Sequence, residues 1–166
     1  MKQGASYIRG KVVHMPPGFA GTTTTARLAG LNYRTLVRWC EREVLFPLRV
    51  GGRGKGSCYA WDSHQILCAT VVGTLRQRVS AVQVRKLANA LRAEGADFAS
   101  KSLIWTPRGR VYVADGGDAV DLQSGQVALL MPLDPVLASL RRRASRAGVV
   151  LDFERHQRRT EEQRPN

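Results

Sequence analysis

Long apolar runs, acidic residues and cysteines are all scarce in this chain of 166 residues. No apolar run approaches the roughly 18 residues that a membrane-spanning helix needs. The first 20 residues also lack the hydrophobic stretch of a secretion signal. We therefore expect a cytoplasmic protein with no membrane partner.

The residues that usually build catalytic and metal centres are few and scattered. The three cysteines contain no CxxC pair, and their odd number argues against a disulfide framework. His14, His64 and His156 lie far apart in the chain and suggest no metal site. Paired carboxylates and Ser/His/Asp or Cys/His arrangements do not emerge either. We therefore expect no enzyme activity, no metal and no cofactor.

Lysine and arginine outnumber the acidic residues by 26 to 13, which gives a formal net charge of +13. Residues 21–100 carry twelve basic and five acidic side chains, residues 1–20 carry three and none, and residues 101–166 carry eleven and eight. A local excess of cations is the electrostatic footprint of a nucleic-acid-binding surface. An arginine-rich genome is the alternative explanation, but here the excess coincides with a motif.

That motif begins with two helices joined by a tight turn. The pattern predicts a short helix over residues 24–29, with Thr22 or Thr23 as its N-cap. Gly30 supplies the turn, and Asn32 caps the second helix. The sequence therefore predicts a helix-turn-helix.

The second helix has an apolar face and a basic face. Its apolar stripe is formed by Tyr33, Leu36, Val37, Cys40 and Val44. Three arginines, Arg34, Arg38 and Arg42, recur every four residues on another face. A helix that buries one face and presents guanidinium groups from another suits the major groove of DNA.

A glycine-rich hairpin over residues 48–61 follows directly. Its centre, GGRGKG, places Arg53 and Lys55 among glycines that allow a tight tip and close approach to a phosphate chain. The spacing does not match a nucleotide-binding P-loop. Behind a helix-turn-helix, such a hairpin is typical of a DNA-binding wing.

Residues 22–92 resemble the MerR family of winged helix-turn-helix proteins. The matching residues are Ala26, Leu28, Ala29, Gly30, Arg34, Thr35, Leu36, Trp39, Leu45, Pro47, Tyr59 and Asp62. The resemblance implies a sequence-specific regulator of transcription, a repressor, that binds double-stranded DNA. The residues expected to contact DNA are Thr24, Tyr33, Arg34, Thr35, Arg38, Arg42, Arg53, Lys55 and Tyr59.

This chain departs from the family pattern in three places. Glu43 stands where the family has a glycine, so we expect the second helix to end differently. Ser57 replaces an arginine of the wing, which would leave the phosphate contacts to Arg53 and Lys55. The family's long dimerisation helix and effector domain are not recognisable after Arg92.

The rest of the chain predicts two more helices, then strands, then a last helix. Asp62 or Ser63 caps a helix to about Arg78, and Ser80 caps another that stops at Gly95. A strand, a turn and a second strand are expected over 103–115, and further short strands at 119–122 and 126–131. In the last helix Asp134 is the N-cap, Pro135 the first residue, and Gly148 lies just beyond the end.

We therefore expect an α+β fold, a winged helix-turn-helix followed by a small antiparallel β-plus-helix module. The predicted parts are a flexible basic arm (1–20), the DNA-binding domain (21–95), the module (100–150) and a disordered tail (151–166). We expect a nucleoid-associated homodimer that self-associates through the module. Two alternatives stay open: an antitoxin that binds a toxin and represses its own operon, and an excisionase-like architectural protein.

Overall fold

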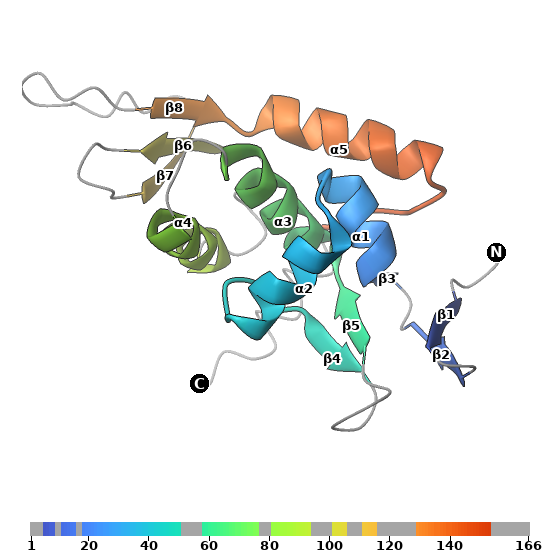
Figure 1. Cartoon of the computed structure of the whole chain (residues 1–166). Helices are drawn as coiled ribbons and strands as arrows, with labels where there is room; N and C mark the ends of the chain where they lie inside the picture. The colour runs from blue at the N-terminus through green and yellow to red at the C-terminus, as the bar shows by residue number, and fades with distance from the viewer. Residues whose placement is uncertain are drawn as a thin grey trace, which may run out of the picture.

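The computed structural model describes residues 5–8, 11–15, 18–50, 58–76, 81–93, 101–105, 111–115 and 129–153. Helices and small antiparallel sheets alternate along the chain, so the predicted α+β class is confirmed (Figure 1). The helices are α1 (Thr22–Ala29), α2 (Tyr33–Glu41), α3 (Ser63–Leu75), α4 (Ala81–Ala93) and α5 (Asp134–Arg146). The strands are β1 (Ala5–Ile8), β2 (Lys11–His14), β3 (Ala20–Gly21), β4 (Leu48–Val50), β5 (Cys58–Trp61), β6 (Lys101–Trp105), β7 (Val111–Asp115) and β8 (Leu129–Pro132).

Helix α3 forms the centre of the hydrophobic core. It carries no charged side chain, and its apolar residues lie on all sides, which is typical of a fully buried helix. Helices α1, α4 and α5 pack against it. Their fully buried residues Leu28, Leu87, Leu91 and Leu140 interlock with Leu67 and its neighbours on α3.

Helix α5 belongs to this same core, although the predicted boundary near residue 100 assigns it to a second module. It lies across α1 and α3 (Figure 1), and Leu133 and Leu140 are fully buried. The chain beyond α5 continues over the core, since the Asp152 N–H donates to the Ser63 Oγ at 2.7 Å and Phe153 packs against buried residues. The first residues of the predicted tail, 151–153, are therefore folded, and residues 154–166 lie outside the described part.

The helix caps agree with the prediction at two positions and differ at two. Asn32 and Asp62 act as N-caps, and Asp62 forms a capping box with Gln65. The predicted N-cap of α1, Thr22 or Thr23, is wrong: Gly21 holds that position without a side-chain bond. For α5 the N-cap is Leu133 rather than Asp134, because the buried Leu133 side chain anchors the entry into the helix.

The strands of the described residues form three separate sheets. The orders are β1–β2, β3–β5–β4 and β7–β6–β8, all antiparallel. The predicted hairpin at 48–61 is confirmed in its strands β4 and β5, and the tip, 51–57, lies outside the described residues. The predicted basic arm contains the β1–β2 hairpin, and Ala20 pairs with Trp61.

Several predicted boundaries fall outside the described residues. Ser80, Gly95 and the expected strand at 119–122 are among them, as is the start of the strand at 126–131, which is described from Leu129 as β8. Helix α3 ends at Leu75, a little before the predicted Arg78. Within the described ranges, no helix combines the length and the apolar character needed to cross a lipid bilayer.

Candidate nucleic-acid interface

Helix α2 lies at the surface, between α1 and the β4–β5 hairpin (Figure 1). Leu36 is the one residue of α2 that is buried, and it is completely inaccessible. Tyr33, Arg34 and Arg38 are exposed, and Thr35 is half-buried. The helix is therefore fixed to the core by one face and leaves the opposite face open.

Both ends of α2 are closed by local hydrogen bonds. At the start, the Asn32 Oδ1 accepts from the Arg34 N–H at 2.9 Å. At the end, the Glu43 N–H donates to the Cys40 carbonyl at 3.1 Å and the Val44 N–H donates to the Trp39 carbonyl at 2.8 Å. This pair of bonds is a Schellman motif, which fixes the last carbonyls of the helix.

The Schellman motif places Glu43 in the left-handed region, with φ of 53°. The expectation that the helix would end differently for lack of a glycine is wrong. The two bonds and the burial of Val44 and Leu45 hold the chain in this conformation. A non-glycine residue there costs about 1–2 kcal/mol, so the fold retains local strain at the end of α2.

The predicted apolar stripe of α2 is correct in part. Leu36 and Val44 are buried, and Val37 and Cys40 are half-buried. Tyr33 is 52% exposed and does not belong to the stripe, because the first turn of α2 projects beyond the core. Tyr33 is exposed next to Arg34, which follows it in the sequence.

The arginines of α2 do not have identical surroundings. Arg34 and Arg38 are exposed on the helix itself. Arg42 is exposed at the C-cap, where its carbonyl accepts from the Arg85 Nη2 at 2.9 Å and links α2 to α4. Glu41 and Glu43 flank Arg42 in the sequence, whereas the first turn of α2 has no acidic residue.

The β4–β5 hairpin adds an aromatic-cationic pair beside α2. Arg49 and Tyr59 are cross-strand partners, and the Arg49 guanidinium carbon lies 5.9 Å from the centre of the Tyr59 ring. Arg49 is an exposed cation that the sequence reasoning did not select, although it is the polar residue between Leu48 and Val50. Arg53 and Lys55 lie outside the described residues.

Two hydrogen bonds join α1 to this hairpin. The Thr22 Oγ1 donates to the Tyr59 carbonyl at 3.5 Å and accepts from the Trp61 Nε1–H at 3.3 Å. The hydroxyl that was predicted to cap α1 is thus engaged across the fold. Thr24, also on α1, is half-buried. Because α1 carries α2 through the Gly30 turn, these bonds fix the helix pair and the hairpin as one surface.

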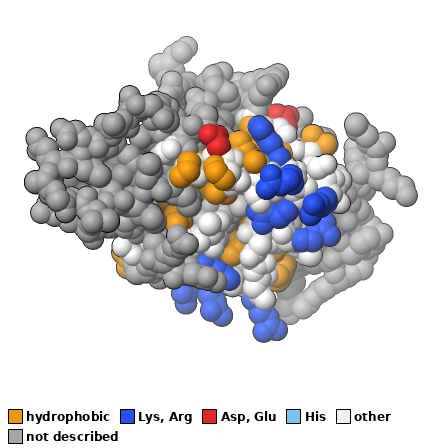
Figure 2. Space-filling view, turned by 90° about the horizontal axis from the view of Figure 1, so that it is seen from above, with side chains coloured by type: hydrophobic (Ala, Val, Ile, Leu, Met, Phe, Trp, Pro, Cys, Tyr) orange, Lys and Arg blue, Asp and Glu red, His pale blue; other side chains and the backbone are white. Residues whose placement is uncertain are grey.

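Helix α5 presents a second basic surface. Arg141, Arg142 and Arg146 are exposed there, and Arg27 is exposed on the neighbouring α1. Seen from the α5 side in Figure 2, Lys and Arg side chains gather over this part of the molecule. Arg143 points inward, and burial lowers the pKa of its guanidinium from the ordinary value.

All three thiols are shifted away from the thiolate form. Burial, with a smaller contribution from Glu41, raises the pKa of Cys40 to about 12, and its Sγ donates to the Leu36 carbonyl at 3.2 Å. Burial also raises the pKa of the Cys68 and Cys58 thiols. The cysteine, histidine and acidic side chains among the described residues form no group that could hold a metal ion.

The surface around α2 therefore offers guanidinium groups, aromatic rings and hydroxyls on a rigid frame. Such groups bind phosphates and the edges of bases by hydrogen bonds and charge. No protein-family model matches this chain, and no curated protein is significantly similar to it.

Proposed function

We propose that this protein binds double-stranded DNA through a winged helix-turn-helix and regulates transcription. In this proposal α1 and α2 are the helix-turn-helix, and the β4–β5 hairpin is the wing. The observation that carries it is the exposure of Tyr33, Arg34 and Arg38 on a helix whose two ends are both fixed. A preorganised cationic helix loses little entropy when it enters a groove.

The side chains divide into readers and anchors. Arg34 and Arg38 lie one turn apart on α2 and would reach base edges in the major groove, with Tyr33 and Thr35 beside them. Arg53 and Lys55 on the wing would contact the flanking phosphates. Arg49, on β4, would add a further phosphate contact. Arg42 continues the basic face at the end of α2.

One copy of such a module reads only a few base pairs, so useful specificity requires two copies on the DNA. Among the described strands of the β7–β6–β8 sheet, β7 and β8 are the two outer ones. Edge strands present unpaired backbone groups that pair readily with another chain. We assign self-association to this sheet and, with it, repression by a homodimer.

Selection of bound sequences from a random duplex pool, followed by anisotropy titrations, tests the proposal. The expected result is an enriched motif whose affinity falls steeply with salt. The double variant Arg34→Ala/Arg38→Ala should lose the motif, whereas Arg142→Gln, a charge change on α5, should retain it. Failure to bind any duplex at low salt, or a variant pair with the opposite effects, would overturn the proposal.

A further inference from the structure

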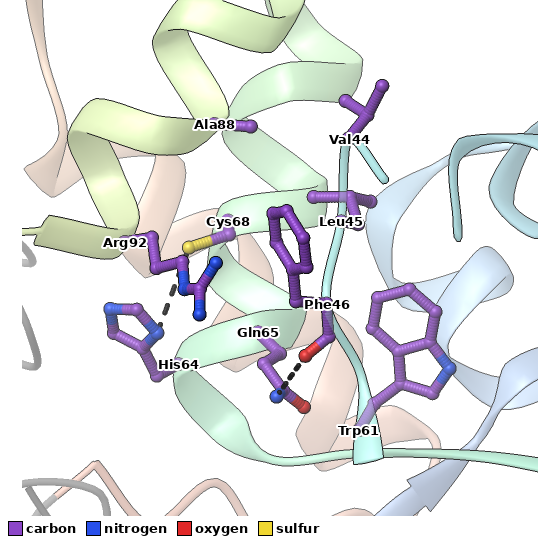
Figure 3. Close-up of a pocket in the computed structure, with 9 residues that line it drawn as sticks. All are labelled: Val44, Leu45, Phe46, Trp61, His64, Gln65, Cys68, Ala88 and Arg92. Atoms are coloured by element: carbon purple, nitrogen blue, oxygen red, sulfur yellow. Dashed lines mark hydrogen bonds between the residues drawn. The ribbon is translucent and has the colours of Figure 1, made fainter. Parts of the chain in front are cut away.

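A cavity of about 220 Å³ lies behind the end of α2 (Figure 3). Its walls come from four parts of the chain: the segment 44–46 after α2, the end of β5, the first turns of α3, and α4. The apolar wall includes Leu45, Phe46 and Trp61, and Ala88 closes one side. The volume is below the roughly 300–1,000 Å³ of sites for drug-sized ligands, so it suits a smaller molecule.

The polar groups of the cavity favour an anion. The Arg92 guanidinium carbon lies 4.3 Å from the centre of the Phe46 ring, and in Figure 3 it is drawn between that ring and His64. Stacking uses the face of a guanidinium and leaves its N–H edge oriented to bind a carboxylate in bidentate fashion. None of the described residues that line the cavity is acidic.

The cavity also adjoins the parts that hold α2 in place. Phe46 lies three residues after Glu43, and its carbonyl accepts from the Gln65 Nε2 at 2.8 Å. The Gln65 Oε1 in turn accepts from the Asp62 N–H at 3.0 Å, within the capping box of α3. A molecule that contacts Phe46 and Gln65 therefore acts on the link between α2, α3 and the hairpin.

We propose that this cavity binds a small aromatic carboxylate and that its occupancy changes the affinity of α2 for DNA. Arg92 holds the carboxylate, and the ring lies against Phe46 and Leu45, with the fully buried Trp61 in the wall behind them. The second half of this proposal rests on the proposed DNA-binding function. A ligand shifts DNA affinity only if it binds the free and the DNA-bound conformations differently, and the linkage is reciprocal.

Titration of the ¹⁵N-labelled full chain with benzoate, without DNA, tests the site. The reporter is the indole N–H resonance of Trp61, a residue that lines the cavity and is completely buried. We expect a saturable shift with benzoate and at least tenfold weaker binding of benzamide, which has the same ring but no charge. Indole-3-acetate serves as a larger probe of the same charge.

Variants on α4 distinguish a site from general charge effects. Arg92→Gln should weaken benzoate at least tenfold and leave benzamide unchanged, and Ala88→Phe should fill the cavity and block both. Lys86→Gln removes an exposed charge from the same helix and should bind benzoate as the unmodified chain does. No saturable shift with either acid, equal binding of benzamide, or equal losses in Arg92→Gln and Lys86→Gln would each refute the site.

DNA anisotropy with and without saturating benzoate tests the coupling separately. A change of threefold or more in the DNA dissociation constant, absent in Arg92→Gln, supports it. An unchanged dissociation constant overturns the coupling and retains the site. A chain that shifts Trp61 with benzoate and binds no duplex overturns both the coupling and the proposed DNA-binding function, while the carboxylate site stands.

Discussion

The Val44 N–H donates to the Trp39 carbonyl at 2.8 Å, and this bond closes α2 around a left-handed Glu43. Among the helix ends that the structure describes, those of α1 at Gly30 and α5 at Gly148 have the same bond pattern, and both place a glycine in the left-handed position. Glu43 is thus the exception among three equivalent positions. The strain lies where α2 passes into the segment that leads to the β4–β5 hairpin.

Glu43→Gly should therefore stabilise the protein. Removing the side chain relieves the left-handed strain, and the greater freedom of glycine in the unfolded chain offsets part of the gain. We expect the free energy of unfolding to rise by about 1 kcal/mol in urea denaturation. Gly148→Ala is the matched control, because nothing lies within 4 Å of the added Cβ and only the backbone strain is introduced. It should destabilise by about 1 kcal/mol. A Glu43→Gly protein that is less stable than the parent would contradict this account.

Local signals allowed parts of this fold to be predicted from the sequence. Asn32, Asp62 and Gly30 act on backbone groups within a few residues, so their roles follow from the chain itself. The roles of Thr22 and Glu43 depend on residues outside their local sequence. The distant Trp61 donates a hydrogen bond to the hydroxyl of Thr22, and buried neighbours hold Glu43 in its strained conformation.

The same distinction applies to the candidate interface. The exposure of Arg34 and Arg38 follows from helical periodicity, but the exposure of Tyr33 depends on where the core ends. The docking of α5 onto α1 and the cavity beside Phe46 join segments that are far apart in sequence. Periodicity carries no information about such contacts.

Single substitutions on α2 should relax sequence preference in DNA binding. If Arg34 or Arg38 forms a bidentate contact with a base, its replacement by alanine removes about 1–3 kcal/mol from the preferred site and little from others. Anisotropy titrations against the selected site and a scrambled duplex provide the comparison. Equal losses on both duplexes would show that these arginines contact phosphates.

Under the proposed function, the β4–β5 hairpin should contribute equally to the binding of all duplex sequences. Arg53 and Lys55 replaced together by alanine should weaken every duplex by a similar factor, because phosphates carry no sequence information. The slope of log affinity against log salt should fall by about 0.9 for each phosphate that the variant no longer neutralises. If the double variant lost its preference for the selected site and kept the same salt slope, the hairpin would read the sequence and α2 would contact phosphates.

Alkylation of Cys40 should be slow and strongly pH-dependent. The thiolate is the reactive form, and burial raises the pKa of this thiol to about 12, so the thiol stays protonated at neutral pH. Between pH 7 and 9.5 the rate with iodoacetamide should rise about tenfold per pH unit, with no plateau. Peptide mapping by mass spectrometry gives the rate. The urea-unfolded chain is the control, because its alkylation rate should level off above about pH 9. A plateau near pH 9 in the folded chain would show that the Cys40 thiol is open to solvent.

Helix α5 should unfold together with α1 and α3. Leu140 is fully buried in a core cluster that includes residues of α1 and α3, so Leu140→Ala leaves a cavity in the shared core and should cost about 2–5 kcal/mol. Hydrogen exchange of the α1 and α3 amides should accelerate along with that of α5, and fluorescence and circular dichroism should report one coincident transition. Val150→Ala, at a residue that is 77% exposed, should change stability by less than about 0.5 kcal/mol. If Leu140→Ala accelerated exchange in α5 alone, α5 would belong to a separate module, and the single core would have to be divided.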